Sequence, residues 1–214
     1  MAGPKAGVFA MNPHRYAHLP EAELEEILLE MVLQTGFLRD VLSRAQELNL
    51  PNWRVVSGAL YNTVWNQLTG RPEGYGIKDV DILYYDPDTS WEAEDRAIKS
   101  ATGFPIEPPV ELRNQARVHL WFARHFGYEI APITSVEDGI DRFASTTHCV
   151  GLRLVDGHYD LYAPYGLRSI FEMKVQPNPL QNNKATHDAK GARQKAMWPE
   201  LEIVSWPNKT NSTS

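Results

Sequence analysis

The chain has 214 residues, a formal net charge of -6 and 43% hydrophobic residues. That length suits one domain, with or without a helical extension, and is enough to bury a sizeable core. The ordinary share of charged and aromatic residues argues against a disordered chain, and the acidic balance argues against a broad nucleic-acid-binding surface, which needs many Lys and Arg residues on one face.

Cysteine usage and hydropathy set the expected compartment and the domain limits. Cys149 is the only cysteine, which excludes an intramolecular disulfide. The first ten residues lack a long apolar run behind basic residues, and no later stretch has the apolar length of a membrane span. We therefore expect a cytoplasmic protein without a membrane segment. Its expected divisions are an N-terminal extension over 1–20, a single domain over 21–206 and a flexible polar tail over 207–214.

The first half of the domain alternates between predicted helices and strands. Apolar residues at helical spacing predict two helices, or one bent helix, over 21–48. A short strand is expected over 53–56, followed by a helix over 59–68. The apolar run over 78–85 predicts a buried strand.

The second half contains the strongest turn signal. A helix is expected over 91–101, a brief strand over 110–112 and a helix over 115–126. Asp156-Gly157 predicts the turn of a β-hairpin, and a last long helix is expected over 185–197. Because helices and strands interleave irregularly, we expect an α/β (α+β) fold with a small mixed sheet packed with helices, not regular βαβ winding.

An acidic pair lies in the predicted strand over 78–85. Residues two apart on a strand point to the same face, so Asp79 and Asp81 should project together while Val80 and Ile82 face the other way. Two buried carboxylates repel each other, and a shared proton or a cation relieves the repulsion. Oxygen ligands with room for phosphates suit Mg²⁺. The pair therefore predicts a metal site, although a structural role with a nearby Lys or Arg explains the two residues alone equally well.

Two further features favour the metal site. A predicted strand runs into Ser57-Gly58 and then a helix, an arrangement in which backbone amides approach phosphate at a helix N-terminus. Glu111 lies at the end of the next short strand and is expected to provide a third carboxylate. By itself each feature has a simpler explanation, a tight turn in one case and a solvated side chain in the other.

Several stretches together resemble a known family. They are Ser57-Gly58-Ala59 through Thr63-Val64-Trp65-Asn66, Ile77-Lys78-Asp79-Val80-Asp81 through Tyr85-Asp86, Ser90-Trp91-Glu92-Ala93-Glu94-Asp95, Glu111-Leu112-Arg113-Asn114-Gln115-Ala116-Arg117-Val118-His119-Leu120-Trp121, and Ala163-Pro164-Tyr165-Gly166-Leu167. With these stretches, the chain resembles the "nucleotidyltransferase family protein" group, formerly a domain of unknown function, within the polymerase-β-like superfamily. The resemblance runs from about Leu24 to the Trp198-Pro199 region.

The resemblance implies a fold and an activity. It implies the polymerase-β-like nucleotidyltransferase fold and a Mg²⁺- or Mn²⁺-dependent site at Asp79, Asp81 and Glu111. The implied reaction transfers a nucleoside monophosphate from an NTP to an acceptor and releases pyrophosphate. Superfamily members commonly show Gly-Ser or Gly-Gly at the phosphate-binding turn, where this chain has Ser57-Gly58.

Basic and polar residues near Glu111 are candidates for phosphate binding. Arg113 lies two residues along the strand, and Asn114 and Arg117 are expected in the first turn of the following helix. Asn114 has a simpler interpretation as a helix cap. Lys190 and Arg193 on the last helix either close over phosphates or form a solvated basic face.

Two alternative functions belong to other classes. Asp86 and Asp88 follow an apolar strand, as the nucleophile and the acid or base do in haloacid dehalogenase-like phosphatases, although a simple turn explains them too. The second alternative is a non-catalytic module that binds a nucleotide on the same fold. For the main interpretation, we expect a small-molecule or protein acceptor and no long nucleic acid, given the acidic charge.

Overall fold

The structure of the protein is a computed structural model that describes residues 12–104 and 107–207. The first part of the predicted N-terminal extension and nearly all of the predicted polar tail therefore lie outside the described residues. Within the described residues, no helix combines the length and the apolar character needed to cross a membrane.

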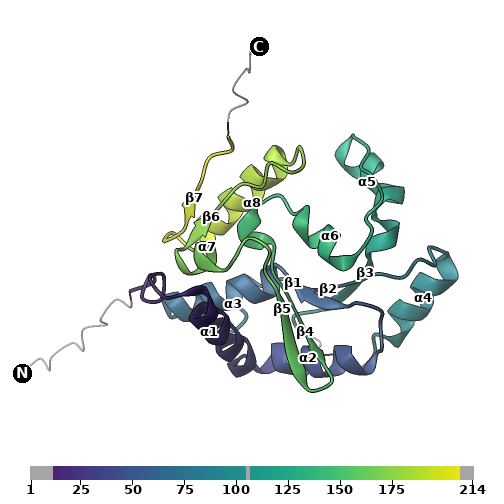
Figure 1. Cartoon of the computed structure of the whole chain (residues 1–214), viewed down its shortest axis with the longest axis horizontal. Helices are drawn as coiled ribbons and strands as arrows, with labels where there is room; N and C mark the ends of the chain where they lie inside the picture. The colour runs from purple at the N-terminus through teal and green to yellow at the C-terminus, as the bar shows by residue number, and fades with distance from the viewer. Residues whose placement is uncertain (1–11, 105–106, 208–214) are drawn as a thin grey trace, which may run out of the picture.

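The central feature is a five-stranded mixed sheet with the order β3-β2-β1-β4-β5 (Figure 1). Its strands are β1 (Arg54–Val56), β2 (Val80–Tyr84), β3 (Val110–Asn114), β4 (Gly151–Val155) and β5 (His158–Tyr162). Strands β2 and β3 are parallel, whereas β1 is antiparallel to both β2 and β4. A second, two-stranded sheet pairs β6 (Lys174–Val175) with β7 (Glu202–Ile203) in parallel. The expected small mixed sheet is confirmed.

Helices cover the large sheet on both faces. On one side lie α1 (Glu21–Gln34), α2 (Gly36–Glu47), α3 (Gly58–Thr69) and α4 (Trp91–Ser100). On the other side lie α5 (Val118–Phe126), α6 (Val136–Asp141) and α8 (Lys184–Met197), with the short α7 (Arg168–Phe171) beside the small sheet. The 3₁₀ turns Gln115–Arg117 and Thr146–His148 precede α5 and β4.

The main core lies between the sheet and the first group of helices. Trp65 of α3 and Trp198, which follows α8, are both fully buried and meet edge to face. The Trp198 indole N–H donates to the Asn66 side chain at 3.1 Å. This contact attaches the C-terminal end of α8 to α3, so α8 is held at a fixed place beside the sheet.

The hairpin and most of the predicted helices agree with the structure. Asp156 and Gly157 have φ values of 49° and 77°, which suit a tight turn between β4 and β5. The predicted strand over 78–85 is shorter in the structure and begins at Val80, so Asp79 precedes it. The predicted strand over 110–112 is longer and continues to Asn114.

Candidate functional site

Parallel pairing of β2 and β3 places two of the predicted carboxylates side by side. Asp81 is paired with Glu111 in the strand register, so both side chains project from the same face of the sheet. Their neighbours Val80 and Ile82 are fully buried in the opposite face. The alternation expected for Asp81 and Glu111 is therefore present, and apolar packing on one face forces the carboxylates onto the other.

Asp79 lies one residue before β2, and its charge reaches Asp81. Burial raises the pKa of Asp81 above its ordinary value, and the negative charge of Asp79 raises it further. The positive charge of Arg113 acts in the opposite direction, and Glu111 again raises this pKa. Three negative charges thus act on one small region, as a cation site requires.

Arg113 occupies the position between the two strand carboxylates. Its guanidinium Nε lies 3.5 Å from an Asp81 oxygen, and another of its nitrogens pairs with Glu111. The side chains are partly exposed, at 54% for Arg113, 41% for Glu111 and 38% for Asp81. Arg113 therefore reaches the acidic cluster, as its position two residues from Glu111 suggested.

The donor chemistry of this cluster suits a hard divalent cation, whereas its present arrangement holds an arginine. Carboxylate oxygens are the ligands that Mg²⁺ prefers. Within the described parts of the chain, no three His, Cys, Asp or Glu side chains stand close enough together to hold a metal ion. The guanidinium is a tethered cation that neutralises Asp81 and Glu111, and its withdrawal would leave those oxygens for a metal.

Asn114 and Arg117, two of the candidates for phosphate binding, lie away from these carboxylates. Because β3 continues to Asn114, strand alternation turns this side chain to the face opposite Arg113. Its amide oxygen accepts from the backbone N–H groups of Asp86 and Ala116, and its amide nitrogen donates to the Asp86 carbonyl. Asn114 is thus a cap and a loop anchor, in agreement with the simpler interpretation.

Arg117 is buried on the same opposite side. Its guanidinium pairs with Glu94 of α4 at 3.0 Å and lies over the Trp91 ring, 4.3 Å from its centroid. A further bond connects it to the Thr89 carbonyl. These three contacts fix the Arg117 side chain against α4 and the preceding loop, so it does not reach Asp81. The sequence expectation assumed that the helix begins directly at residue 115, but a 3₁₀ turn there redirects the chain.

The predicted strand, Ser57-Gly58 turn and helix are present. Ser57 has φ 56° and ψ −115°, a conformation that favours glycine, and α3 begins at Gly58 without a side-chain cap on its first N–H groups. The Ser57 N–H donates to the Val150 carbonyl at 2.9 Å, and its hydroxyl bonds to Tyr61. Ser57 therefore shapes the turn, whereas the first amides of α3 are the groups that suit an anion.

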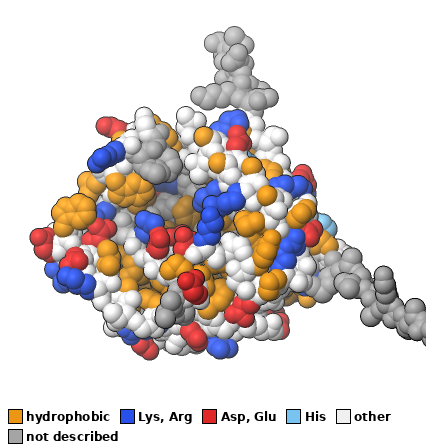
Figure 2. Space-filling view, turned by 180° about the vertical axis from the view of Figure 1, so that it is seen from behind, with side chains coloured by type: hydrophobic (Ala, Val, Ile, Leu, Met, Phe, Trp, Pro, Cys, Tyr) orange, Lys and Arg blue, Asp and Glu red, His pale blue; other side chains and the backbone are white. Residues whose placement is uncertain are grey.

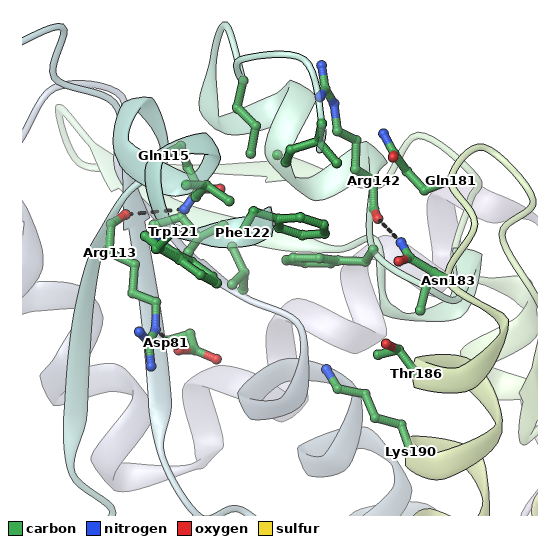
Figure 3. A pocket seen from close by; sticks show the side chains of 18 residues that line it. Asp81, Arg113, Gln115, Trp121, Phe122, Arg142, Gln181, Asn183, Thr186 and Lys190 are labelled. Atoms are coloured by element: carbon green, nitrogen blue, oxygen red, sulfur yellow. Dashed lines mark hydrogen bonds and ion pairs between the residues drawn. The ribbon is translucent and has the colours of Figure 1, made fainter. Parts of the chain in front are cut away.

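Helix α8 brings basic residues to the acidic cluster. Lys190 and Arg193 are one helical turn apart, and the charge of Lys190 acts on Asp81. Burial lowers the pKa of Lys190, and the charges of Asp81 and Asp79 partly offset that effect. Figure 3 shows the Lys190 side chain extending from α8 toward the cavity beside Asp81. This placement favours a role at the site over a purely solvated basic face.

A buried polar network connects the turn at Ser57 to α8, and no sequence pattern indicated it. Gln194 of α8 donates to the Tyr61 hydroxyl at 2.9 Å, and its amide oxygen lies 3.2 Å from the His148 ring nitrogen. The rings of Tyr61 and His148 stack at 4.6 Å. Burial raises the pKa of Tyr61 to about 12 and lowers the pKa of His148 well below its usual range, so both are neutral at pH 7. The network fixes α8 relative to Ser57.

Cys149 and the pair Asp86 and Asp88 have structural roles. Burial raises the pKa of Cys149 to about 12, which leaves a protonated thiol instead of a nucleophile. The Asp86 carboxylate accepts from the Asp88 N–H at 2.9 Å, and the Asp88 carboxylate accepts from the Ser90 N–H at 3.0 Å. This pair of turns leads the chain from β2 into α4, in agreement with the turn interpretation and without an arrangement for nucleophilic attack.

A cavity of about 400 Å³ opens on the face that carries Asp81. The sheet forms its floor, and α5, α6, α8 and the loop between α5 and α6 form its walls. Figure 2 shows this side of the molecule hollowed, with Lys or Arg and Asp or Glu side chains around the hollow. Asp81 and Arg113 lie side by side at the cavity, Lys190 extends toward it from α8, and Trp121 and Phe122 also line it (Figure 3).

Comparisons with known proteins agree with this geometry. A family described as "Nucleotidyltransferase" matches residues 43–203, about three quarters of the chain. None of the curated proteins matches the sequence. A solved structure described as "The NMR structure of the protein reveals a CCA-adding enzyme head domain" superposes with a TM-score of 0.66 at 24% identity, over 85% of this chain and 96% of that one. The fold expected from the resemblance, the nucleotidyltransferase head fold, is confirmed.

Proposed function

This chain belongs to the nucleotidyltransferase family, and on that premise we propose that it transfers a nucleoside monophosphate from an NTP to a small-molecule acceptor and releases pyrophosphate. The observation that carries this proposal is the pairing of Asp81 with Glu111 on adjacent parallel strands, with Asp79 beside them. A bound Mg²⁺ or Mn²⁺ would neutralise phosphate charge and lower the pKa of the attacking hydroxyl. Asp79, Asp81 and Glu111 would hold it.

The chain's own groups account for the binding of the triphosphate. The uncapped N-terminus of α3 offers backbone N–H groups to an anion. Lys190 and Arg193 of α8 add positive charge, and both act electrostatically on groups of the site. Arg113, when it leaves the carboxylates, is a third cation within reach. These groups offset the negative charge of the triphosphate, which increases in the transition state.

Calorimetric titration tests nucleotide binding directly. Each of the four NTPs is titrated with Mg²⁺ and again with EDTA, and we expect binding that EDTA removes. Asp79→Asn and Asp81→Asn should lose this binding while they remain folded, and Asp95→Asn, an exposed residue of α4 that pairs with Lys99, is the matched control. Undiminished metal-dependent binding in both site variants would refute the proposed site.

A second test separates catalysis from binding. Mass spectrometry after incubation with each NTP and Mg²⁺ or Mn²⁺ should detect acceptors that gain a nucleoside monophosphate. Glu111→Gln should retain NTP binding but lose most of the turnover, since the Asp pair would hold the nucleotide-bound ion and Glu111 would complete the metal site that activates the acceptor. If the wild type binds NTP and never forms a product, the non-catalytic nucleotide-binding module becomes the better account.

A nucleic-acid acceptor is the second candidate. The matched structure is described as a CCA-adding enzyme head domain, and an enzyme of that kind extends a nucleic acid. The acidic charge of this chain favours the small molecule instead. Adding an RNA oligonucleotide to the same incubations tests both, since an extended oligonucleotide would establish the second candidate.

A further inference from the structure

The cavity beside Asp81 is built chiefly from apolar side chains. Its volume of about 400 Å³ falls in the range of small-molecule sites, roughly 300–1,000 Å³. The apolar wall comes from the sheet, from α5, from the loop after α5 and from the residues that follow α6, and it includes Leu83, Val118, Trp121, Phe122, Ile133 and Phe143. A surface of this kind suits an occupant with an aromatic or aliphatic body.

Several polar side chains of the wall are already bonded within the protein. Gln115 donates to the Arg113 carbonyl, and Asn183 donates to the Arg142 carbonyl while it accepts from Tyr128 (Figure 3 shows the first two bonds). The Arg142 guanidinium pairs with Asp138 at 2.7 Å. These three groups therefore offer little for reading the polar edge of a nucleobase, which needs uncommitted donors and acceptors.

The cavity also lies on the acceptor side of the acidic cluster. The described residues that line it include Asp81, Arg113 and Lys190 but neither Ser57 nor Gly58. In an in-line displacement, the attacking group and the leaving pyrophosphate occupy opposite sides of the α-phosphorus. With pyrophosphate held by the N-terminus of α3, an attacking group in this cavity would approach from a side that Ser57 and Gly58 do not line.

We propose that this cavity is the acceptor pocket, and that the acceptor is a small molecule with an apolar body and one hydroxyl or amine directed at Asp81. This inference rests on the proposed function and names its substrate class. The acceptor oxygen or nitrogen forms a new bond to the α-phosphorus, the bond between the α-phosphorus and the bridging oxygen breaks, and pyrophosphate leaves. The acceptor's proton is released to water.

Binding of 2-naphthol, an apolar aromatic alcohol, tests the pocket without any nucleotide. Val118→Trp narrows the cavity from α5 and should weaken 2-naphthol binding by about tenfold or more, equivalent to about 1.4 kcal/mol. The matched control is Ile98→Trp, an exposed residue of α4 on the other side of the sheet, which should bind as the wild type does. Phe122→Ala enlarges the same cavity and should shift the preference toward larger phenols. Unchanged 2-naphthol binding in both cavity variants overturns the assignment.

Measuring NTP binding, alone and together with 2-naphthol, distinguishes a failure of this inference from a failure of the proposed function. Val118→Trp should bind Mg²⁺ and NTP within about twofold of the wild type, and 2-naphthol should bind alongside the NTP. Competition between them would show that the cavity holds the nucleobase and would overturn the acceptor assignment. If 2-naphthol binds normally but no NTP binds to the wild type, the proposed function fails while the pocket stands.

Product analysis completes the test. Phenols, aliphatic alcohols and amines are compared with sugars as acceptors, and each nucleotidylated product is identified by its added mass. We expect products from the apolar acceptors and a loss of those products in Val118→Trp. Products formed from sugars alone would contradict the inference.

Discussion

The folded protein disfavours the ionised form of the Asp81 carboxylate. Burial and the charge of Asp79 both raise its pKa above 3.8, so the folded protein binds this proton more tightly than the unfolded chain does. Protonated Asp81 therefore contributes to the free energy of unfolding. This contribution is complete below the ordinary pKa of 3.8, and it is lost as pH rises through the raised pKa of the folded protein. At neutral pH, folding therefore works against an ionised Asp81, as is common where residues serve function over stability.

The first prediction follows from that sign. In EDTA at pH 7, Asp81→Asn should melt above the wild type, and the difference should shrink as pH falls through the raised pKa of Asp81 toward its ordinary value of 3.8. Asp88→Asn is a control of opposite sign, because bonds from Ser90 hold the pKa of Asp88 below its usual range. That variant should melt at or below the wild type at pH 7. Calorimetric melting curves across pH check both, and a less stable Asp81→Asn at pH 7 would contradict the argument.

Arg113 gives a second prediction at this scale. Because its guanidinium pairs with Asp81 and Glu111, it competes with any metal for the same oxygens. Arg113→Ala should strengthen Mn²⁺ binding in the absence of NTP by up to about fivefold, since half-exposed ion pairs are worth roughly 0.2–1 kcal/mol. Arg96→Ala, which removes an exposed partner of Asp88, should leave Mn²⁺ binding unchanged. Weaker Mn²⁺ binding to Arg113→Ala would show that the arginine organises the carboxylates instead.

Ser57 gives the third prediction. Its φ of 56° with ψ −115° is a conformation that costs a non-glycine residue about 1–3 kcal/mol. Ser57→Gly removes that cost but adds about 0.4–1 kcal/mol of unfolded-state entropy and loses the bond to Tyr61. Ser57→Ala loses the same bond and keeps the strain. The glycine variant should therefore be the more stable of the two by about 1 kcal/mol in urea unfolding, and the reverse order would show that the turn is unstrained.

At the scale of elements, α8 is the part of the site that sequence patterns identified least well. Its helical span was predictable, but its position was not, because Trp198 and Gln194 fix it through contacts with α3 and His148 that are distant in sequence. Strand β6 has only two residues and depends on β7 for its pairing, so it carries no local signal. By contrast, the hairpin at Asp156-Gly157 is a local feature and was predicted correctly.

Whether the orientation of a site residue could be predicted depended on how well the ends of its strand or helix were predicted. Asp81 and Glu111 follow from strand alternation within segments that were correctly identified as strands. Asn114 was assigned to a helix, but β3 extends through it, and its side chain consequently points to the other face. Strand β3 extends two residues beyond the predicted strand. The side chains of Arg113 and Asn114 therefore lie on opposite faces of the sheet.

The fourth prediction concerns the basic face of α8. If Lys190 contacts the triphosphate, Lys190→Gln should weaken binding of Mg²⁺ and NTP by about tenfold or more, because hydrogen bonds to charged groups are worth about 1.5–3 kcal/mol. Its stability should not fall, since burial already lowers the pKa of this lysine. Lys184→Gln, at the exposed start of the same helix beside Asp188, is the matched control. Equal affinities for the two variants, measured by calorimetry, would exclude Lys190 from the phosphate site.

At the scale of the whole molecule, charge and shape bear on the class of acceptor. The net charge is -6, and the hollowed face in Figure 2 mixes acidic and basic side chains around its opening instead of presenting a continuous basic surface. A long polyanion needs such a surface, because its affinity comes largely from many phosphate contacts that release counterions. The apolar wall of the cavity and its volume of about 400 Å³ suit a small occupant for the same site.

The fifth prediction tests that conclusion. Labelled single-stranded RNA and DNA should bind the protein only weakly at physiological ionic strength, with dissociation constants above about 10⁻⁵ M, as for weak non-specific binding. The few cations near the carboxylates, Lys190, Arg193 and Arg113, would give a shallow dependence of affinity on salt, since the slope scales with the number of phosphates neutralised. Fluorescence anisotropy from low to physiological salt measures both quantities. A steep slope with low-micromolar affinity at physiological salt would favour the nucleic-acid acceptor, because only an extended track of phosphate contacts produces that combination.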